Sequence, residues 1–191
     1  MRLRRLQQEF GEAVTVCHRS FVLIAEDRSD RTFKDYHRDH RHAASTQDSD
    51  SPPFRIPAAG ERYPRGSLPA LEAAAWVRQE QPNLFPAFDL ALFEAFFGRT
   101  EDISDPETLA RIAASVGADP DGVREALASA RFRQLVLDEH HEAAGRGIRS
   151  VPTVLIPGRP AVVGAVPYPD LREAVAAGCS GESRGGTSEG S

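Results

Sequence analysis

Apolar residues at helical spacing dominate the middle of the chain. From Ser67 to Gly145 they recur every three or four residues, in stretches separated by proline or glycine. Such spacing places apolar side chains along one side of a helix. The clearest helix start is Asp105-Pro106-Glu107, because a capping residue, proline and an acid are typical of a first turn. The pattern predicts helices over about 68–81, 85–97, 105–116, 120–130 and 132–145.

The two ends of the chain predict a smaller α/β part. Leu3, Leu6 and Phe10 have the spacing of the last turns of a helix, with Gly11 as its C-cap. The alternation that follows predicts a strand over about 13–23. Near the other end, short apolar runs around a Pro-Gly turn predict two further strands. These strands span about 151–156 and 161–165, and a closing helix follows over about 169–175.

The stretch from residue 26 to residue 66 lacks a comparable apolar pattern. It predicts at most one short helix, around 31–42, and a polar loop over about 43–66 that is richest in Ser, Asp and Pro between Ser45 and Pro53. Residues 179–191 are rich in Gly and Ser, and this composition predicts a disordered tail.

Two motifs near the C-terminal end carry a family resemblance. Val151-Pro152-Thr153 stands just before an apolar strand, after Gly147-Ile148, and Gly164-Ala165-Val166-Pro167-Tyr168 follows. The first motif resembles the cis-proline segment of thioredoxin-fold proteins. Together with the second, it resembles the DsbA-like branch and, within it, the FrnE-type subfamily. The resemblance covers most of the chain and is most specific over 103–178.

The resemblance implies an α/β, thioredoxin-like fold with an all-helical insertion, with the first strand missing from this sequence. Residues 1–25 and 148–178 would form the thioredoxin-like part, and residues 26–147 the mostly helical insertion. Without its central first strand, such a sheet exposes unpaired edges and an apolar face. We therefore expect the chain made alone to be poorly stable or to aggregate.

The implied activity is thiol–disulfide oxidoreduction, which the family performs with a Cys-x-x-Cys pair between its first strand and first helix. This sequence has only Cys17 and Cys179. The redox turn is therefore absent, either because the start is assigned too late or because the chain is a truncated homologue, and we assign no catalytic residue. The resemblance implies a cis Val151–Pro152 bond. It also implies that Val151 and Pro152 contact an extended substrate, by strand addition.

Two alternatives remain open. The 2-hydroxychromene-2-carboxylate isomerases and kappa-class glutathione transferases share the helical insertion and the Val-Pro loop, and would use glutathione with a serine or cysteine in the same missing turn. A non-catalytic remnant would bind peptides beside Pro152 without redox chemistry. The helix start at Ser104-Asp105-Pro106 and the motif ending at Tyr168 favour the FrnE-type interpretation.

Composition limits the classes of partner. A length of 191 residues with 40% hydrophobic content suits one domain, or one domain with an insertion. A net charge of −5 argues against a nucleic-acid surface. No stretch approaches the roughly 18–20 apolar residues of a membrane span, and the basic N-terminus lacks the apolar run of a secretory signal. We expect a cytoplasmic protein without a cofactor. Its partners would be protein or peptide thiols and disulfides, with glutathione a further candidate.

The cysteines and the aromatic stripe have plain structural interpretations. Cys17 falls on the predicted strand at 13–23, where a small buried residue is the expected role. Cys179 falls in the predicted tail, and nothing in the sequence supports a disulfide between the two. The phenylalanines between Phe85 and Phe97 are at helical spacing, which favours core packing over a substrate pocket.

The histidines do not form a recognisable metal motif. His37, His40 and His42 lie near two aspartates, but their spacing does not place all three on one helix face, and no cysteine accompanies them. We interpret them as part of a solvated polar segment and predict no metal site. His140 and His141 are adjacent on a predicted helix and cannot face one site together, so we place them on the helix surface.

Overall fold

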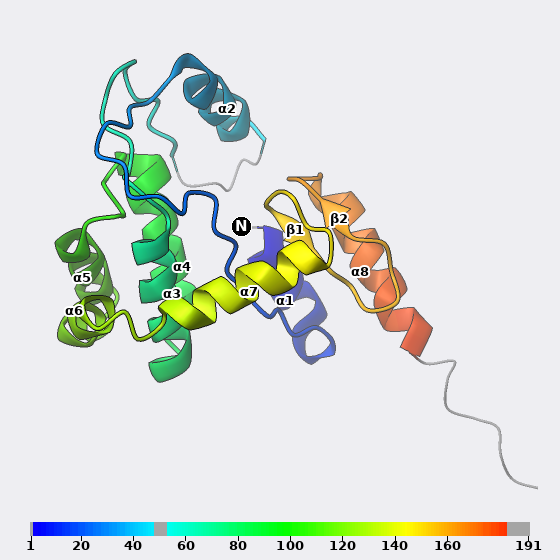
Figure 1. The fold of residues 1–191 in the computed structure, drawn as a ribbon. Helices are drawn as coiled ribbons and strands as arrows, with labels where there is room; N and C mark the ends of the chain where they lie inside the picture. The colour runs from blue at the N-terminus through cyan, green and yellow to red at the C-terminus, as the bar shows by residue number, and fades with distance from the viewer. Residues whose placement is uncertain (1, 48–52, 183–191) are drawn as a thin grey trace, which may run out of the picture. The chain divides into compact units, whose positions relative to one another are not determined.

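The computed structural model describes residues 2–47 and 53–182, with side chains up to Ser180. The chain is rich in helix and carries a small sheet (Figure 1). It divides into two compact units. Unit 1 combines residues up to His18 with those from Ala143 onward, and unit 2 runs from Arg19 to Glu142.

The helices predicted for the middle of the chain are confirmed. Asp105 accepts a hydrogen bond from the Thr108 N–H (2.8 Å), and Asp119 accepts one from the Asp121 N–H (2.9 Å), so both proline-marked starts are capped as their sequences predict. The elements are α3 (Leu68–Glu80), α4 (Phe85–Phe93), the π-helical turn η2 (Glu94–Gly98), α5 (Pro106–Ser115), α6 (Pro120–Ala128) and α7 (Arg133–Gly145).

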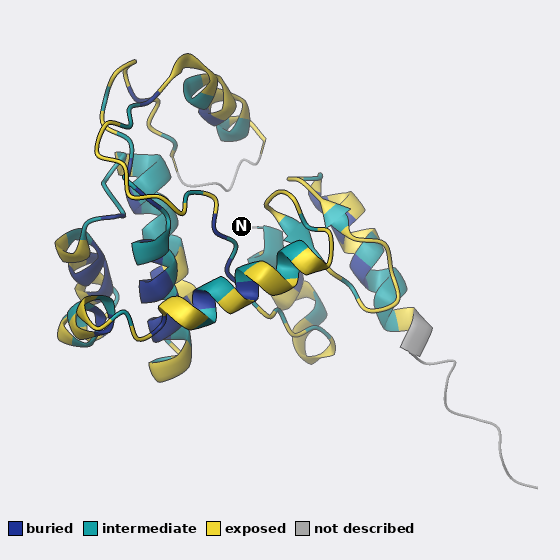
Figure 2. Ribbon diagram, in the orientation of Figure 1, coloured by how far each residue is buried: buried dark blue, intermediate teal, exposed yellow. Residues whose placement is uncertain are grey.

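The core of unit 2 lies where α3, α4, α5 and α6 pack together (Figure 2). Phe85 and Phe88 belong to this core, as predicted, whereas Phe93, Phe96 and Phe97 of the same stripe are only partly buried and lie outside it. Burying each large apolar side chain contributes roughly 1.5–3 kcal/mol, so these helices owe their stability to packing more than to intrinsic propensity. The large apolar side chains that are fully buried in this core are Val77, Phe88, Leu109, Ile112, Val123 and Val136.

The helix in the polar stretch, α2 (Asp35–Ser45), begins and ends later than predicted. Its Arg41 is only 4% exposed and lies against the rings of Phe33, Phe96 and Phe97, at 4.4–5.0 Å from their centroids. Burial lowers the pKa of the Arg41 guanidinium from its ordinary value. Cation–π contacts thus attach this polar helix to the aromatic end of α4 and η2. The sequence pattern of α2 alone does not reveal this attachment.

The first turn of α2 makes the stability of unit 2 depend on pH. The Lys34 N–H donates to Nδ1 of His37 (3.0 Å), and burial, followed by the charges of Arg31 and Arg41, lowers the His37 pKa from 6.5. The folded state therefore resists a proton that the unfolded chain accepts. This contribution to stability is fully present above pH 6.5 and is lost as the pH falls through the lower folded pKa.

We predict that unit 2 loses up to ~1 kcal/mol of its free energy of unfolding, the contribution of a typical cap, when the pH is lowered from 7 to 5. The loss should appear as a lower urea midpoint at pH 5. In His37→Gln the amide oxygen can accept from the Lys34 N–H at every pH, so the part of the pH dependence of stability that comes from His37 should disappear. An unchanged pH profile in His37→Gln would contradict the prediction.

The strand predicted over 13–23 is wrong, since residues 14–20 have no regular structure. The alternation does indicate an extended backbone, but no strand in the described part of the chain pairs with it. Within unit 2, side chains take the place of a neighbouring strand. The N–H groups of Ser20, Val22 and Ile24 donate in turn to Glu139 Oε2 (2.7 Å), His140 Nδ1 (3.2 Å) and Ser67 Oγ (3.1 Å).

Unit 1 contains two helices and a hairpin, in the order α1 (Arg2–Phe10), β1 (Thr153–Val154), β2 (Val162–Val163) and α8 (Tyr168–Glu182), with a short 3-10 turn, η1 (Gly11–Ala13), after α1. The predicted end of α1 is confirmed by the positive φ of Gly11 (54°). The core of unit 1 consists of Leu6, Tyr168, Leu171 and Val175.

The hairpin and the last helix differ in length from the prediction. The antiparallel strands pair only Thr153 with Val163 and Val154 with Val162, so both are shorter than predicted. Helix α8 continues to Glu182, and residues 179–182 are therefore helical rather than part of a tail. The rest of the predicted tail, 183–191, and residues 48–52 of the predicted loop lie outside the described residues.

Charged groups fix α1 against α8 within unit 1. Glu9 accepts hydrogen bonds from the Tyr168 hydroxyl and from Nε of Arg172, and Arg5 lies over the Tyr168 ring at 4.0 Å. The hydrogen bond from Tyr168, followed by that from Arg172, lowers the pKa of the Glu9 carboxyl. These contacts position the N-terminal end of α8, which directly follows the hairpin.

Candidate functional site

The segment from Gly147 to Pro152 follows a well-defined end of helix α7, within unit 1. Gly147 has a φ of 81°, which favours glycine, and the Ile148 N–H donates to the carbonyl of Ala143 (3.0 Å). Arg149 Nη1 donates to the carbonyl of Ala144 (3.0 Å). The carbonyl groups of Ala143 and Ala144 at the end of α7 are thus paired, and the segment leaves the helix in one direction.

The Val151–Pro152 peptide bond is cis. The carbonyl of Pro152 accepts from the Gly164 N–H (2.8 Å), and the Thr153 hydroxyl donates to the carbonyl of Ser150 (2.7 Å). Val151, between these contacts, is 44% exposed. Among the described residues its own N–H and C=O have no hydrogen-bond partner. Val151 therefore presents one free backbone donor and one free backbone acceptor.

The hairpin has one exposed apolar face beside this segment. Thr153 and Val163 share one side of the hairpin because they lie directly opposite each other, and Val151 and Leu155 flank Thr153 along the chain. Val151, Leu155 and Val163 are all exposed, at 44%, 46% and 57%. The other face packs into the core of unit 1 through Val154, Ile156 and Val162. We call the group Val151, Thr153, Leu155 and Val163 the hairpin face.

Neither cysteine lies where its sequence context predicts. Cys17 is exposed rather than buried, because the strand that was to bury it does not form. Cys179 belongs to α8 rather than to a tail, with its Sγ 4.0 Å from the carbonyl of Ala13. Both are free thiols. Neither stands at the N-terminus of a helix, the position that favours a reactive thiolate in this chemistry.

His140 has a structural role. In the described part of the chain, no group of three or more His, Cys, Asp or Glu side chains could hold a metal ion. His140 is not the plain surface residue that the sequence indicates. Its Nδ1 accepts from the Val22 N–H (3.2 Å), and its ring contacts Phe21 edge-on at 4.8 Å. This role depends on the extended segment lying along α7, which no local pattern reveals.

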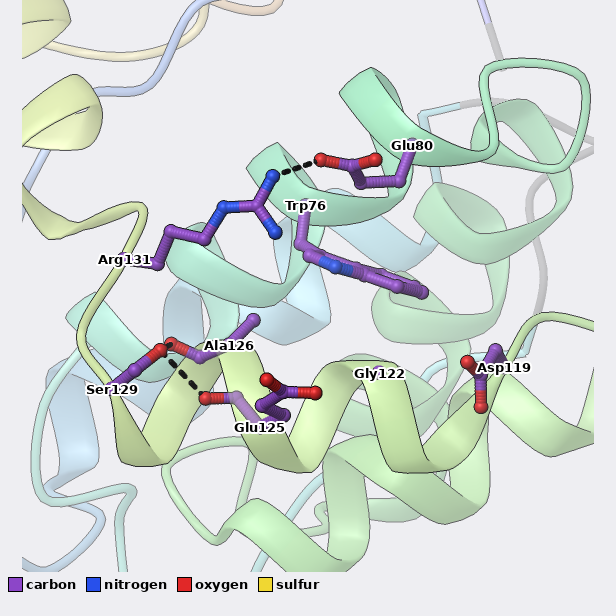
Figure 3. Close-up of a pocket in the computed structure, with 8 residues that line it drawn as sticks. All are labelled: Trp76, Glu80, Asp119, Gly122, Glu125, Ala126, Ser129 and Arg131. Atoms are coloured by element: carbon purple, nitrogen blue, oxygen red, sulfur yellow. Dashed lines mark hydrogen bonds and ion pairs between the residues drawn. The ribbon is translucent and has the colours of Figure 1, made fainter.

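A separate pocket lies in unit 2, between the C-terminal part of α3 and helix α6 (Figure 3). Sequence analysis missed it because its walls come from helices distant in sequence. The only local indication of this pocket in the sequence was Gly122, a glycine inside the helical pattern of α6. The residues that line it are Trp76, Glu80, Asp119, Gly122, Glu125, Ala126, Ser129 and Arg131.

Across residues 2–47 and 53–182, every helix is too short or too polar to span a bilayer.

Comparisons with known proteins agree with this fold. A putative protein disulfide isomerase from Nitrosomonas europaea superposes with a TM-score of 0.76 at 19% identity, over 96% of this chain and 90% of its own. A probable DsbA oxidoreductase from Streptomyces coelicolor gives 0.75 at 19% identity, over 100% of this chain and 85% of its own. No curated protein matches. The family model for the DSBA-like thioredoxin domain matches residues 1–176, and the chain belongs to this DsbA-like family.

Proposed function

We propose that this chain is a FrnE-like member of the DsbA family that binds extended segments of cytoplasmic proteins carrying thiols or disulfides. Val151 and Pro152 would form the contact. In this proposal residues 1–25 and 148–178 act as the thioredoxin-like part, and residues 26–147 as its helical insertion. The observation that carries the proposal is the free N–H and C=O of the exposed Val151.

An extended peptide suits this surface for two reasons. The free backbone groups of Val151 can pair with the backbone of a client, as in strand addition, and so require no particular client sequence. The hairpin face beside them is apolar and exposed, so it favours clients with alternating apolar side chains. Such segments are accessible in unfolded proteins, which are the molecules in which thiols and disulfides can exchange freely.

The redox step needs a pair of thiols. A thiolate attacks one sulfur of a client disulfide and displaces the other as a thiolate. A second thiol of the enzyme then breaks the mixed disulfide, so the client is reduced and the enzyme oxidised. This sequence has no Cys-x-x-Cys, and its two cysteines are far apart in the sequence, with Cys17 in a segment without regular structure and Cys179 in α8. With the 191-residue chain alone we therefore expect client binding without turnover, which is also what a non-catalytic peptide-binding protein would do.

Substituting Val151 tests the proposed contact. Val151→Pro removes the backbone N–H, whereas Val151→Ala trims the side chain and keeps both backbone groups. We expect Val151→Pro to weaken binding of a fluorescein-labelled, reduced and unfolded peptide about fivefold, the effect of one lost hydrogen bond of roughly 1 kcal/mol. Val151→Ala should weaken it less, and fluorescence anisotropy measures both.

Equal affinities of the proline variant and the unaltered chain would contradict the role of the Val151 backbone. An absence of peptide binding by the unaltered chain would overturn the proposed function. In the same preparation, we expect no reduction of insulin disulfides by dithiothreitol above the uncatalysed rate. Catalysed reduction would show that the two cysteines present suffice for turnover.

A further inference from the structure

The pocket between α3 and α6 contains an indole N–H without an acceptor in the described part of the chain. Trp76 is only 6% exposed, yet in the described part of the chain its indole N–H has no hydrogen-bond partner. The indole nitrogen itself is not fully buried, so it keeps an opening to solvent. Because Trp76 lines the pocket, a ligand there could accept this hydrogen bond.

Gly122 makes this arrangement possible. A Cβ atom at Gly122 would lie 2.3 Å from Cζ2 and 2.8 Å from Cη2 of Trp76, so only glycine lets the indole lie this close to α6. In Figure 3 the indole lies over that helix. The pocket has a volume of about 240 Å³. This is below the roughly 300–1,000 Å³ of sites for drug-sized ligands, and it suits a single side chain.

The charge of the pocket is negative. Glu80 forms an ion pair with Arg131, so these two charges compensate each other. Asp119 caps α6 with one oxygen. The carboxylate of Glu125 has no ion pair or hydrogen bond within the described residues. Asp119 and Glu125 lie along one stripe of α6, with Gly122 between them. A ligand would therefore meet two uncompensated carboxylates and one indole donor.

We propose that this pocket binds an arginine side chain of a partner peptide. The guanidinium pairs with Glu125, and its aliphatic part lies along Trp76 and Ala126. The peptide carbonyl of the same residue accepts the indole N–H. Arginine is favoured over lysine because a planar guanidinium fits beside an indole and binds a carboxylate through two hydrogen bonds. This site is separate from the Val151 segment and does not rest on the proposed function.

Fluorescence offers a direct test, because Trp76 is the only tryptophan of the chain. We would titrate the full chain with Nα-acetyl-arginine methylamide. The same titration would use the citrulline analogue, which has nearly the same shape without the charge, and free arginine. The variant is Glu125→Gln. The control is Glu173→Gln, which removes an exposed carboxylate on α8. Circular dichroism checks that both variants keep their helices.

We expect a saturable change in Trp76 emission with the acetylated arginine amide, and at least tenfold weaker binding of the citrulline analogue. Glu125→Gln should weaken arginine binding by a similar factor, and Glu173→Gln should not change it. Free arginine should bind more weakly than the amide, because its own carboxylate meets Asp119 and Glu125. This comparison separates a peptide residue from the free amino acid.

Three results would overturn the proposal. The first is equal binding of the arginine and citrulline compounds, and the second is unchanged affinity in a folded Glu125→Gln variant. The third is the absence of both an emission change and a heat of binding by calorimetry. Tighter binding of free arginine than of the amide would reassign the site to a small-molecule ligand and so reject a peptide partner.

Discussion

Replacing Glu139 with alanine is expected to lower the free energy of unfolding by about 3 kcal/mol, the lower end of the range for breaking a buried ion pair. The side chain of Glu139 is 5% exposed, and its carboxylate binds Arg78 at 2.6 Å and Arg19 at 3.2 Å. It also accepts the Ser20 N–H at 2.7 Å. Alanine removes this carboxylate from both arginines and leaves the Ser20 N–H without its acceptor. The lower end of the range applies because the Arg19 side chain is 65% exposed, so water can solvate its charge when the carboxylate is removed.

Glu139→Gln separates the charge from the hydrogen bond. Glutamine keeps an oxygen for the Ser20 N–H but loses the attraction to Arg78, so its stability should lie between those of the unaltered chain and Glu139→Ala. Urea unfolding followed by circular dichroism measures all three. An alanine variant that unfolds at the same urea concentration as the unaltered chain would contradict the role given to Glu139.

The same carboxylate should contribute to acid sensitivity. Burial by itself would raise the pKa of Glu139, but the hydrogen bond from Ser20 and the charge of Arg78 outweigh it and hold this pKa below 4.5. The unfolded chain therefore takes up the proton first. The contribution is fully present above pH 4.5 and is lost as the pH falls through the folded pKa. In Glu139→Gln, the loss of stability in this acid range should be smaller.

Leu6→Ala is expected to destabilise unit 1 by about 2–5 kcal/mol, the usual result of removing a buried leucine side chain. Leu6 is 1% exposed, and the core that it shares with Tyr168, Leu171 and Val175 is small. A core of this size has few other contacts to offset the cavity. We therefore expect unit 1 to unfold at lower urea concentration in this variant, before unit 2.

Two probes distinguish the units. Trp76 lies in unit 2, so its emission reports on that unit, whereas far-ultraviolet circular dichroism reports helix loss in both. In Leu6→Ala the first transition should appear by dichroism with little change in emission. Leu155→Ala is the matched control, because Leu155 is 46% exposed and its truncation should cost under ~1 kcal/mol. Coincident transitions by both probes would show instead that the units unfold together.

The helices could be predicted because their signals are local. Asp105 and Asp119 cap helices that begin with proline, and the burial of Phe88 follows from the spacing of its neighbours. The strand at 13–23 could not be predicted correctly. Alternation indicates an extended backbone, but whether that backbone pairs with a strand or with side chains such as Glu139 depends on residues more than a hundred positions away.

The two candidate sites also differ in how much of each could be predicted from the sequence. The Val151–Pro152 segment was identifiable because its motif is continuous in the sequence. Its free backbone groups and the exposure of the hairpin face became visible only with the register of β1 and β2. The pocket at Trp76 was missed because it requires α3 and α6 to approach at Gly122. A glycine inside a helix is an ambiguous signal until the facing helix is known.

The order of the two units along the chain has a consequence for synthesis on the ribosome. Unit 2 is continuous, from Arg19 to Glu142, and can fold as soon as it has emerged. Helix α1 emerges before unit 2, but its partner α8 is translated after it. At about 5–20 residues per second, the stretch from Ala143 to Glu182 takes on the order of 2–8 s to make. During that interval the apolar side of α1 around Leu6 has no native partner, and a chaperone that shields it would act on the nascent chain.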